Sequence, residues 1–395
     1  MNIVIQESYY HFLDNFIRKH LDLLSKSRVM IFGAGTRGIN VLWMLKYNKI
    51  KNIYFVDNNQ KKQGEEIEGI DIISFEKAQT YTGRTVYLCP VEKGESILSQ
   101  LRGAGYEENI DYFNLDFFFT EYQDIITQIK GNNLNYSILF GCCILSSWIM
   151  GKDQIEVSLG KRIQQEFSQQ NWLVFSLPGL NVVEYYHLLN IMKLLQKEKP
   201  RMVCITLEMS SMSPYAPLMV GTQNLIQHKM LFESLIKLEP QNIELQEHLR
   251  TIESRLQKSK SGRNLTSADN TPEAKRKVYE LKYLYNLRES DEAVVYTKKI
   301  LEQMNRENIP VVLLSPPVDY MTGKKICGPD FNNRYIANIQ KLKNFLDGYR
   351  FISIDASFLA MSDMFVPQDQ APNINPFLNY EGQKCLIDFI KMQLR

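Results

Sequence analysis

The sequence has little that would build a metal site, a disulfide framework or a nucleic-acid surface. Its six cysteines include no CxxC pair, so neither a zinc site nor a set of disulfides is indicated. The chain carries 46 lysines and arginines against 44 aspartates and glutamates. The resulting net charge of +2 lacks the basic surplus of a dedicated nucleic-acid-binding protein. We therefore expect no bound metal and no nucleic-acid partner.

Long apolar runs are also missing. No window approaches the ~20 uninterrupted apolar residues that a membrane-spanning helix needs. The first seven residues lack the basic start and apolar core of a signal peptide. These absences predict a cytoplasmic protein with reduced thiols. Its 395 residues are enough for two domains, or for two domains with an insertion.

The most informative motif is a glycine-rich turn near the N-terminus. An apolar segment, 29–32, predicts a strand, and residues 39–45 predict a helix. Between them lies a G-x-G-x-x-G pattern formed by Gly33, Gly35 and Gly38. Such a turn lets the backbone approach a phosphate closely, and the helix N-terminus supplies the positive end of a dipole.

A second predicted strand, 53–56, is followed by Asp57, which lies 22 residues beyond Gly35. In dinucleotide-binding sheets a ribose-binding acid stands at about this position. We therefore predict a nucleotide-type ligand: a nucleotide sugar, NAD(P) or coenzyme A. The predicted ligand-binding residues are Gly33, Gly35, Arg37, Gly38, Asp57 and Asn58. The alternative is a domain that has lost its ligand and only packs against its neighbour.

The segments 57–64 and 67–74 add a family likeness to this pattern. Residues 25–120 resemble the small Rossmann-like domain of bacterial sugar-nucleotide and surface-glycan enzymes. The resemblance implies a nucleotide-type ligand without fixing which one. We place this domain at residues 1–130, ending in a connecting helix within 118–134 and a polar turn.

The second half, 135–395, repeats the alternation of strands and helices. Strands are predicted at 136–140, 172–175, 202–207, 311–314 and 351–355, and residues 147–170 are expected to be largely helical. The pattern predicts a second parallel sheet with helices on both faces. A helical insertion at about 215–305 carries helices at 220–257 and 272–306.

A polar loop, 257–272, joins the helices of the insertion. Basic residues in and after it could close over an anionic ligand, although a solvated helical hairpin explains them more simply. These residues are Lys258, Lys260, Arg263, Lys275, Arg276 and Lys277.

The order of elements in 135–395 resembles the SGNH (GDSL-like) hydrolase and acyltransferase superfamily. Three places carry the likeness: the turn Gly141-Cys142-Cys143, where the family has Gly-Asp-Ser; Gly179 after the second strand; and the run 378–384, which resembles the family's His-Leu-Asn-x-x-Gly block. The resemblance implies a three-layer SGNH- or flavodoxin-like fold. It also implies action on an acyl ester, as an O-acyltransferase or esterase.

Three departures from the family pattern affect the predicted chemistry. The positions of the family's last Asp and His hold Asn375 and Phe377, and a phenyl ring cannot take a hydroxyl proton. The third block, 207–211, lacks the asparagine of the oxyanion hole, and the nucleophile position is a cysteine. Standard SGNH catalysis is therefore not expected.

A rebuilt site would use Cys143 as a thiolate, made more acidic by the dipole of a following helix. Candidate bases are His187, within the core repeat of this domain, and Glu208, at the end of a strand. The substrate would then be a glycan or a sugar nucleotide, and the protein could form homo-oligomers. Two alternatives stay open: a catalytically inactive SGNH-like binding protein, in which the cysteines merely pack, and an NAD(P)-dependent oxidoreductase.

Overall fold

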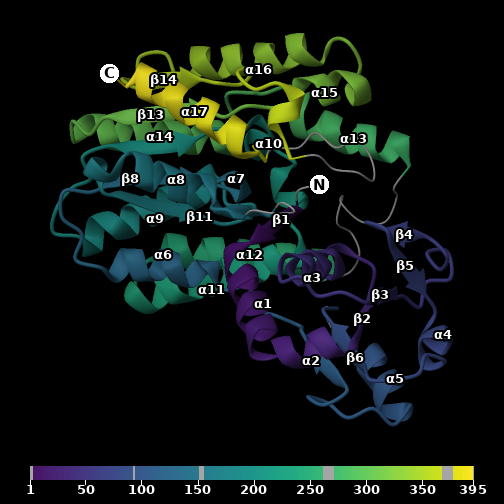
Figure 1. Ribbon diagram of the computed structural model, residues 1–395. Coiled ribbons are helices and arrows are strands. Elements are labelled where there is room, and N and C mark those ends of the chain that lie inside the picture. The colour runs from purple at the N-terminus through teal and green to yellow at the C-terminus, as the bar shows by residue number, and fades with distance from the viewer. Residues whose placement is uncertain (1–2, 92–93, 151–154, 261–270, 367–376, 395) are drawn as a thin grey trace. The chain divides into compact units, whose positions relative to one another are not determined.

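The computed structural model describes residues 3–91, 94–150, 155–260, 271–366 and 377–394. Internal contacts divide the chain into two units. The N-terminal unit comprises Asn2–Phe119 and Met150–Ile155, and the C-terminal unit comprises Thr120–Ile149 and Glu156–Arg395. Each unit is built from helices around a mainly or wholly parallel sheet of its own (Figure 1).

The N-terminal unit contains a six-stranded sheet in the order β4-β5-β3-β2-β6-β7. Its strands are β2 (Arg28–Phe32), β3 (Ile53–Val56), β4 (Glu66–Ile67), β5 (Ile70–Ile73), β6 (Thr85–Cys89) and β7 (Tyr112–Asn114). All neighbours pair in parallel except β4 and β5. In chain order the parallel strands lie 3-2-1-4-5, the order of a doubly wound dinucleotide-binding sheet. The predicted Rossmann-like sheet is confirmed.

The other elements of this unit are β1 (Ile3–Gln6), α1 (Glu7–Lys19), α2 (Leu21–Lys26), α3 (Thr36–Tyr47), α4 (Phe75–Gln79) and α5 (Glu95–Gly103). The amphipathic pattern of residues 5–26 predicts a single helix, but the structure breaks it at His20, whose backbone leaves the helical region. The expected apolar stripe is present, because Tyr9, Leu13 and Ile17 recur every fourth residue and are buried.

The C-terminal unit contains a five-stranded, fully parallel sheet in the order β11-β8-β12-β13-β14. Its strands are β8 (Ser137–Gly141), β11 (Trp172–Ser176), β12 (Val203–Thr206), β13 (Val311–Ser315) and β14 (Ile352–Asp355). The chain order 2-1-3-4-5 is that of flavodoxin-like doubly wound sheets. All five predicted strands are present, and the predicted α/β class with two parallel sheets is confirmed.

Helices cover both faces of this sheet. Ile138 and Phe140 of β8 point into one apolar core, and Leu139 points into the other. The first core includes side chains from α9 and α14, and the second includes side chains from α8 and α17.

The helices of the unit are α6 (Glu121–Lys130), α7 (Cys143–Ser146), α8 (Leu159–Glu166), α9 (Val182–Leu195), α10 (Met209–Met212), α11 (Thr222–Leu238), α12 (Ile243–Lys260), α13 (Pro272–Tyr283), α14 (Glu292–Arg306), α15 (Tyr320–Cys327), α16 (Phe331–Phe345) and α17 (Tyr380–Gln393).

The predicted helical insertion is confirmed as α11 to α14, between β12 and β13. Residues 261–270, at the centre of the predicted basic loop, lie outside the described residues. The expectation that 147–170 is largely helical was wrong: two short strands, β9 (Ser147–Met150) and β10 (Ile155–Glu156), precede α8. Trp148 and Ile149 favour extended backbone, and Ser158 caps α8 by accepting the Lys161 N–H at 3.3 Å.

None of the helices that the structure describes combines the length and apolar character needed to cross a bilayer.

Candidate functional site

The three glycines of the N-terminal turn have three different surroundings. Gly33 follows β2 with φ +114°, a region that favours glycine. A Cβ atom on Gly38 would lie 2.0 Å from the Gly33 carbonyl oxygen, so Gly38 allows α3 to pack against the turn. Gly35 has no atom within 4 Å of where its Cβ would stand. Glycines have three roles in dinucleotide-binding turns: the first allows the tight turn, the second leaves space for the ligand to approach the backbone, and the third allows close packing of the helix.

Asp57 ties this turn to the loop after β3. Its Oδ2 accepts the Ala34 N–H at 2.9 Å and Lys62 Nζ at 3.2 Å, and its Oδ1 accepts the Asn59 N–H at 2.9 Å. Burial would raise the pKa of Asp57, but these hydrogen bonds outweigh it and hold the pKa below its usual value. Asp57 is thus an ionised carboxylate beside the glycine turn, with Lys62 as its counter-ion.

Two other predicted ligand-binding residues take part in contacts within the unit. Arg37 Nη1 binds Asp116 Oδ1 at 2.8 Å, and its guanidinium lies 5.3 Å from the centre of the Phe119 ring. Asn58 Nδ2 donates to Gln100 Oε1 at 3.0 Å. Arg37 therefore links α3 to the segment after β7, whereas Asn58 lies on the exposed rim near α5.

In the C-terminal unit, the turn after β8 brings two thiols to the carboxyl edge of the sheet. Gly141 is required there, because a Cβ would lie 2.3 Å from Leu145 Cδ1 and 2.8 Å from Thr206 Oγ1. Cys142 is buried and Cys143 is partly exposed. The helix that Cys143 begins, α7, has only four residues, so the expected acidifying dipole is too short to be effective.

A buried hydrogen bond joins this turn to the end of β12. Cys142 Sγ donates to Glu208 Oε1 at 2.8 Å, and the two cysteine sulfurs lie 3.6 Å apart. The contact with Cys143, then burial, then the Glu208 carboxylate hold the pKa of Cys142 well above its usual value. Burial raises the pKa of Glu208. The structure thus places two of the predicted residues, Cys143 and Glu208, on either side of Cys142.

Lys282, near the end of α13, lies close enough to the two thiols and Glu208 to interact with them electrostatically, and it was not predicted from the sequence. The carbonyl oxygen of the neighbouring Leu281 accepts a hydrogen bond from Ser213 Oγ at 2.6 Å. Tyr285 Oη donates a hydrogen bond to the Met209 carbonyl oxygen at 2.9 Å. These bonds attach the end of α13 to α10, which directly follows Glu208. Burial lowers the pKa of Lys282, against the opposing charges of Cys143, Cys142 and Glu208. The cluster therefore pairs thiols and a carboxyl group with one amine.

His187, the other predicted base, lies on α9 in a different cluster. Its ring is 4.9 Å from the His248 ring and 5.9 Å from the Phe232 ring. Burial lowers the pKa of His187 to about 4, so the imidazole is neutral near pH 7. Among the described residues, no hydrogen bond or ring contact joins it to Cys143 or Glu208.

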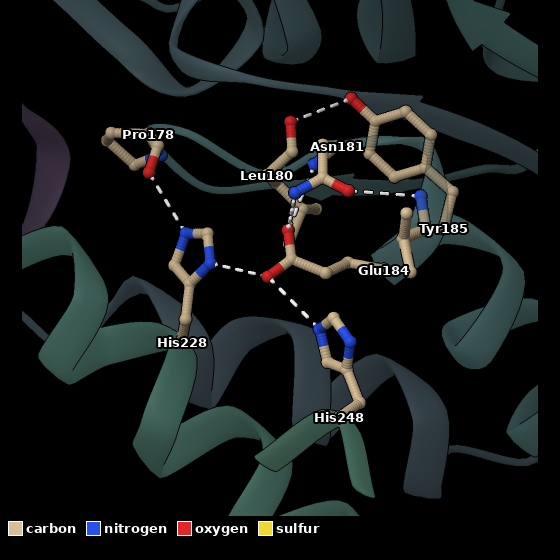
Figure 2. A network of polar contacts seen from close by, with 8 residues as sticks. Pro178, Leu180, Asn181, Glu184, Tyr185, His228 and His248 are labelled. Carbon is tan, nitrogen blue, oxygen red and sulfur yellow. Dashed lines mark hydrogen bonds and ion pairs between the residues drawn. The ribbon is translucent and has the colours of Figure 1, made fainter. Parts of the chain in front are cut away.

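Glu184 lies at the centre of that second cluster (Figure 2). Its side chain is fully buried. Its Oε1 lies 2.7 Å from His228 Nδ1 and 3.6 Å from His248 Nε2. Its Oε2 accepts the Asn181 backbone N–H at 3.0 Å, in a capping box that begins α9. Across the described residues, no three His, Cys, Asp or Glu side chains are grouped so as to hold a metal ion.

The run that resembles the last SGNH block begins α17. Asn379 Oδ1 accepts the Gly382 N–H at 3.0 Å and so caps the helix. A Cβ on Gly382 would lie 2.4 Å from the Met364 carbonyl oxygen. Both residues are explained by capping and close packing. Asn375 lies outside the described residues.

One comparison with known protein families matches part of the N-terminal unit. The family model described as C2185-like, N-terminal matches residues 25–110, within the N-terminal unit. No curated protein is detectably similar to the chain in sequence. The two sheet orders define the chain as an α/β protein with a Rossmann-type unit followed by a flavodoxin-type unit.

Several solved structures superpose on most of the chain at low similarity. A GDSL-like lipase from Bacteroides thetaiotaomicron has 11% identity and a TM-score of 0.32, covering 69% of this chain and 95% of its own. A protein described as an acylhydrolase, from Bacteroides fragilis, has 11% identity and a TM-score of 0.31, with 68% and 93% covered. A protein described as a platelet activating factor, from Streptococcus pneumoniae, has 10% identity and a TM-score of 0.34, with 76% and 99% covered. Likeness at this level carries no argument about activity.

Proposed function

We propose that the C-terminal unit processes an acyl ester, as an O-acyltransferase or esterase with Cys143 as its nucleophile. The observation that carries this proposal is the hydrogen bond from Cys142 to Glu208, formed beside the partly exposed Cys143 thiol and within electrostatic reach of Lys282. Open parallel sheets bind their ligands outside the carboxyl ends of the strands, where these residues lie. Thiol, carboxyl and amine groups are types of group that nucleophilic catalysis uses.

In the proposed reaction, Cys143 Sγ attacks the ester carbonyl carbon, and the ester C–O bond breaks to leave a thioester. The leaving alcohol takes up the proton that the thiol releases. An acceptor hydroxyl, or water, then attacks the thioester carbonyl carbon, the C–S bond breaks to release the new ester or the carboxylic acid, and the acceptor's proton returns to sulfur. Lys282 supplies positive charge where the thiolate and the acyl oxygen carry negative charge. Glu208 fixes Cys142, which borders the nucleophile at 3.6 Å.

The N-terminal unit is proposed to bind a nucleotide-type ligand, namely a nucleotide sugar, NAD(P) or coenzyme A. Support comes from the open space at Gly35, the start of α3 and the ionised Asp57 at the end of β3. Together the two proposals describe a cytoplasmic bacterial protein that modifies a glycan or sugar nucleotide. A homo-oligomer is compatible with this function.

Turnover of p-nitrophenyl acetate tests the acyl chemistry. We expect the purified protein to release p-nitrophenolate, and Cys143→Ala to reduce the rate to background. Cys385→Ala is the matched control, because Cys385 is a free, partly exposed cysteine on α17, outside the cluster. Equal rates for the wild-type protein and Cys143→Ala would contradict the proposal. Retention of a ligand without turnover would then favour the inactive binding protein.

The oxidoreductase alternative is distinguished by the ligand that remains bound after purification. Native mass spectrometry followed by denaturation identifies that ligand. A nucleotide sugar or a coenzyme A thioester supports group transfer. A bound nicotinamide cofactor that is reduced and reoxidised during turnover would instead support hydride transfer.

A further inference from the structure

A buried ion pair lies behind the turn that follows β11, and the proposed chemistry does not use it directly. His228, on α11, is in contact with Glu184 Oε1 through Nδ1 at 2.7 Å and with the Pro178 carbonyl oxygen through Nε2 at 3.0 Å (Figure 2). His228 and Glu184 are 1% and 0% exposed. The histidine therefore joins the inserted helices to the backbone of a turn at the carboxyl edge of the sheet.

The two partners of His228 fix its charge. A carboxylate oxygen and a carbonyl oxygen both accept hydrogen bonds, so both ring nitrogens must donate. An imidazole donates from both nitrogens only as the imidazolium. The electrostatics agree: burial would lower the pKa of His228, but the Glu184 carboxylate and the Pro178 carbonyl outweigh it and raise the pKa. Burial would raise the pKa of Glu184, yet His228 and His248 hold it low.

The bond to Pro178 also fixes the peptide group that follows it. A trans peptide is planar, with its C=O and N–H pointing in opposite directions, and no described peptide bond is cis. The Pro178 carbonyl faces His228, so the Gly179 N–H points away from α11. Gly179 has φ +85°, and a Cβ there would lie 2.9 Å from two Val220 methyl groups. No hydrogen bond donated by the Gly179 N–H is found among the described residues.

The Pro178–Gly179 turn and the thiol turn follow two neighbouring strands of the sheet. β11 and β8 are neighbours in register, with Ser176 opposite Gly141. Two residues after Ser176 the chain reaches Pro178, and two residues after Gly141 it reaches Cys143. Tyr185 Oη binds the Leu180 carbonyl at 3.2 Å, and the Cys142 charge is among the causes that raise the pKa of Tyr185. Both turns therefore follow neighbouring strands at the carboxyl edge of one sheet.

We infer that the Glu184–His228 ion pair is a positioning device for the acyl chemistry proposed above, on which this inference rests. It holds the Pro178–Gly179 peptide so that the Gly179 N–H faces the crevice and can donate to the acyl oxygen. His228 touches neither the substrate nor Cys143. It acts through the backbone of the turn, and so it is a positioning residue.

The test is His228→Gln in the full-length protein, with His248→Gln as its matched control. His248 also faces Glu184 Oε1, at 3.6 Å, but has no hydrogen bond to Pro178. With p-nitrophenyl acetate, we expect His228→Gln to lower kcat by about tenfold or more, with KM nearly unchanged, because the acyl oxygen loses a preorganised donor. We expect His248→Gln to keep kcat within about twofold.

Hydrogen–deuterium exchange of peptides covering residues 177–181 gives a second readout that does not depend on activity. Faster exchange there in His228→Gln, but not in His248→Gln, is expected because only the former releases the turn. His228→Lys, which restores a positive donor, should recover part of the kcat. Such recovery would not follow if His228 were only a packing residue.

The outcomes separate this inference from the proposed function. If turnover depends on Cys143 but His228→Gln keeps the wild-type kcat and exchange rates, the positioning role is wrong and the acyl chemistry stands. If turnover is independent of Cys143, the proposed function fails. The positioning role then fails with it, even if the turn exchanges faster in His228→Gln.

Discussion

Two buried glutamates in the C-terminal unit have opposite electrostatic environments. Glu184 is in contact with two histidines and caps α9, and its pKa is held below the usual value. Glu208 accepts a hydrogen bond from a thiol, and burial raises its pKa. A paired carboxylate at a helix start serves the fold, whereas a buried carboxyl group with a raised pKa at the carboxyl edge of a sheet is typical of functional sites. The partners, and not the residue type, decide the role.

The largest expected difference between them is in stability. Glu184→Gln leaves the His228 imidazolium buried without a counter-charge, and we expect a loss of about 3–5 kcal/mol in the free energy of unfolding. Glu208→Gln keeps an acceptor for the Cys142 thiol and should cost at most about 1 kcal/mol. Urea denaturation followed by circular dichroism measures both. Equal losses of unfolding free energy in Glu184→Gln and Glu208→Gln would contradict the different roles assigned to the two glutamates.

The pH dependence of stability sharpens the same comparison. Glu184 has a lowered pKa, so its contribution is present above about pH 4.3 and is lost as the pH falls through the folded-state pKa. His228 has a raised pKa, so its contribution is complete below about pH 6.5 and is lost as the pH rises through the folded-state value. The ion pair should therefore stabilise the protein most between these two limits.

His187 makes the free energy of unfolding depend on pH on the acid side as well. Its pKa is lowered to about 4, so stability should rise by about 3 kcal/mol as the pH increases from 4 to 6.5. We therefore expect the stability of the protein to be greatest near pH 6.5. His187→Gln should make stability nearly independent of pH between pH 4 and 6.5, and it should leave the loss of stability at alkaline pH unchanged. Denaturant titrations at half-unit pH steps test this, and an unchanged acid limb in the variant would contradict it.

Activity should depend on the other glutamate and on its amine neighbour. We expect Glu208→Leu, which removes the acceptor of the Cys142 thiol, and Lys282→Met, which removes a positive charge, each to lower kcat for p-nitrophenyl acetate by about 10–100-fold. The control is Lys391→Met, because Lys391 binds Glu166 on the surface, outside the cluster. If Lys282→Met behaved like Lys391→Met, Lys282 would have no part in the site.

A smaller effect is expected in the N-terminal unit, where two glycines differ as the two glutamates do. Gly38→Ala forces a Cβ to within 2.0 Å of a backbone oxygen and should cost about 1–3 kcal/mol. Gly35→Ala meets open space and should change stability by less than about 0.5 kcal/mol. It should nevertheless weaken the retention of a phosphate-bearing ligand. Thermal melts and native mass spectrometry measure the two effects.

The elements of the fold were predictable because their signals are local. Apolar runs such as 137–141 and the glycines at 33–38 specify strands and turns within a few residues. The contacts of the site were not predictable in this way. Cys142 meets Glu208 across 66 positions, and His228 meets Glu184 across 44. Lys282 lies at the end of an ordinary amphipathic helix, where nothing in the local pattern distinguishes it from a surface lysine.

Trapping the acyl-enzyme tests the central claim most directly. The full-length protein would be mixed with p-nitrophenyl acetate, quenched in acid and digested, and its peptides mapped by mass spectrometry. The account predicts one acetyl group on Cys143 in the wild-type protein, more of it in Lys282→Met if that variant slows deacylation, and none on Cys385. Turnover with no acetyl group on Cys143, or acetylation spread equally over both cysteines, would contradict a site built around this thiol.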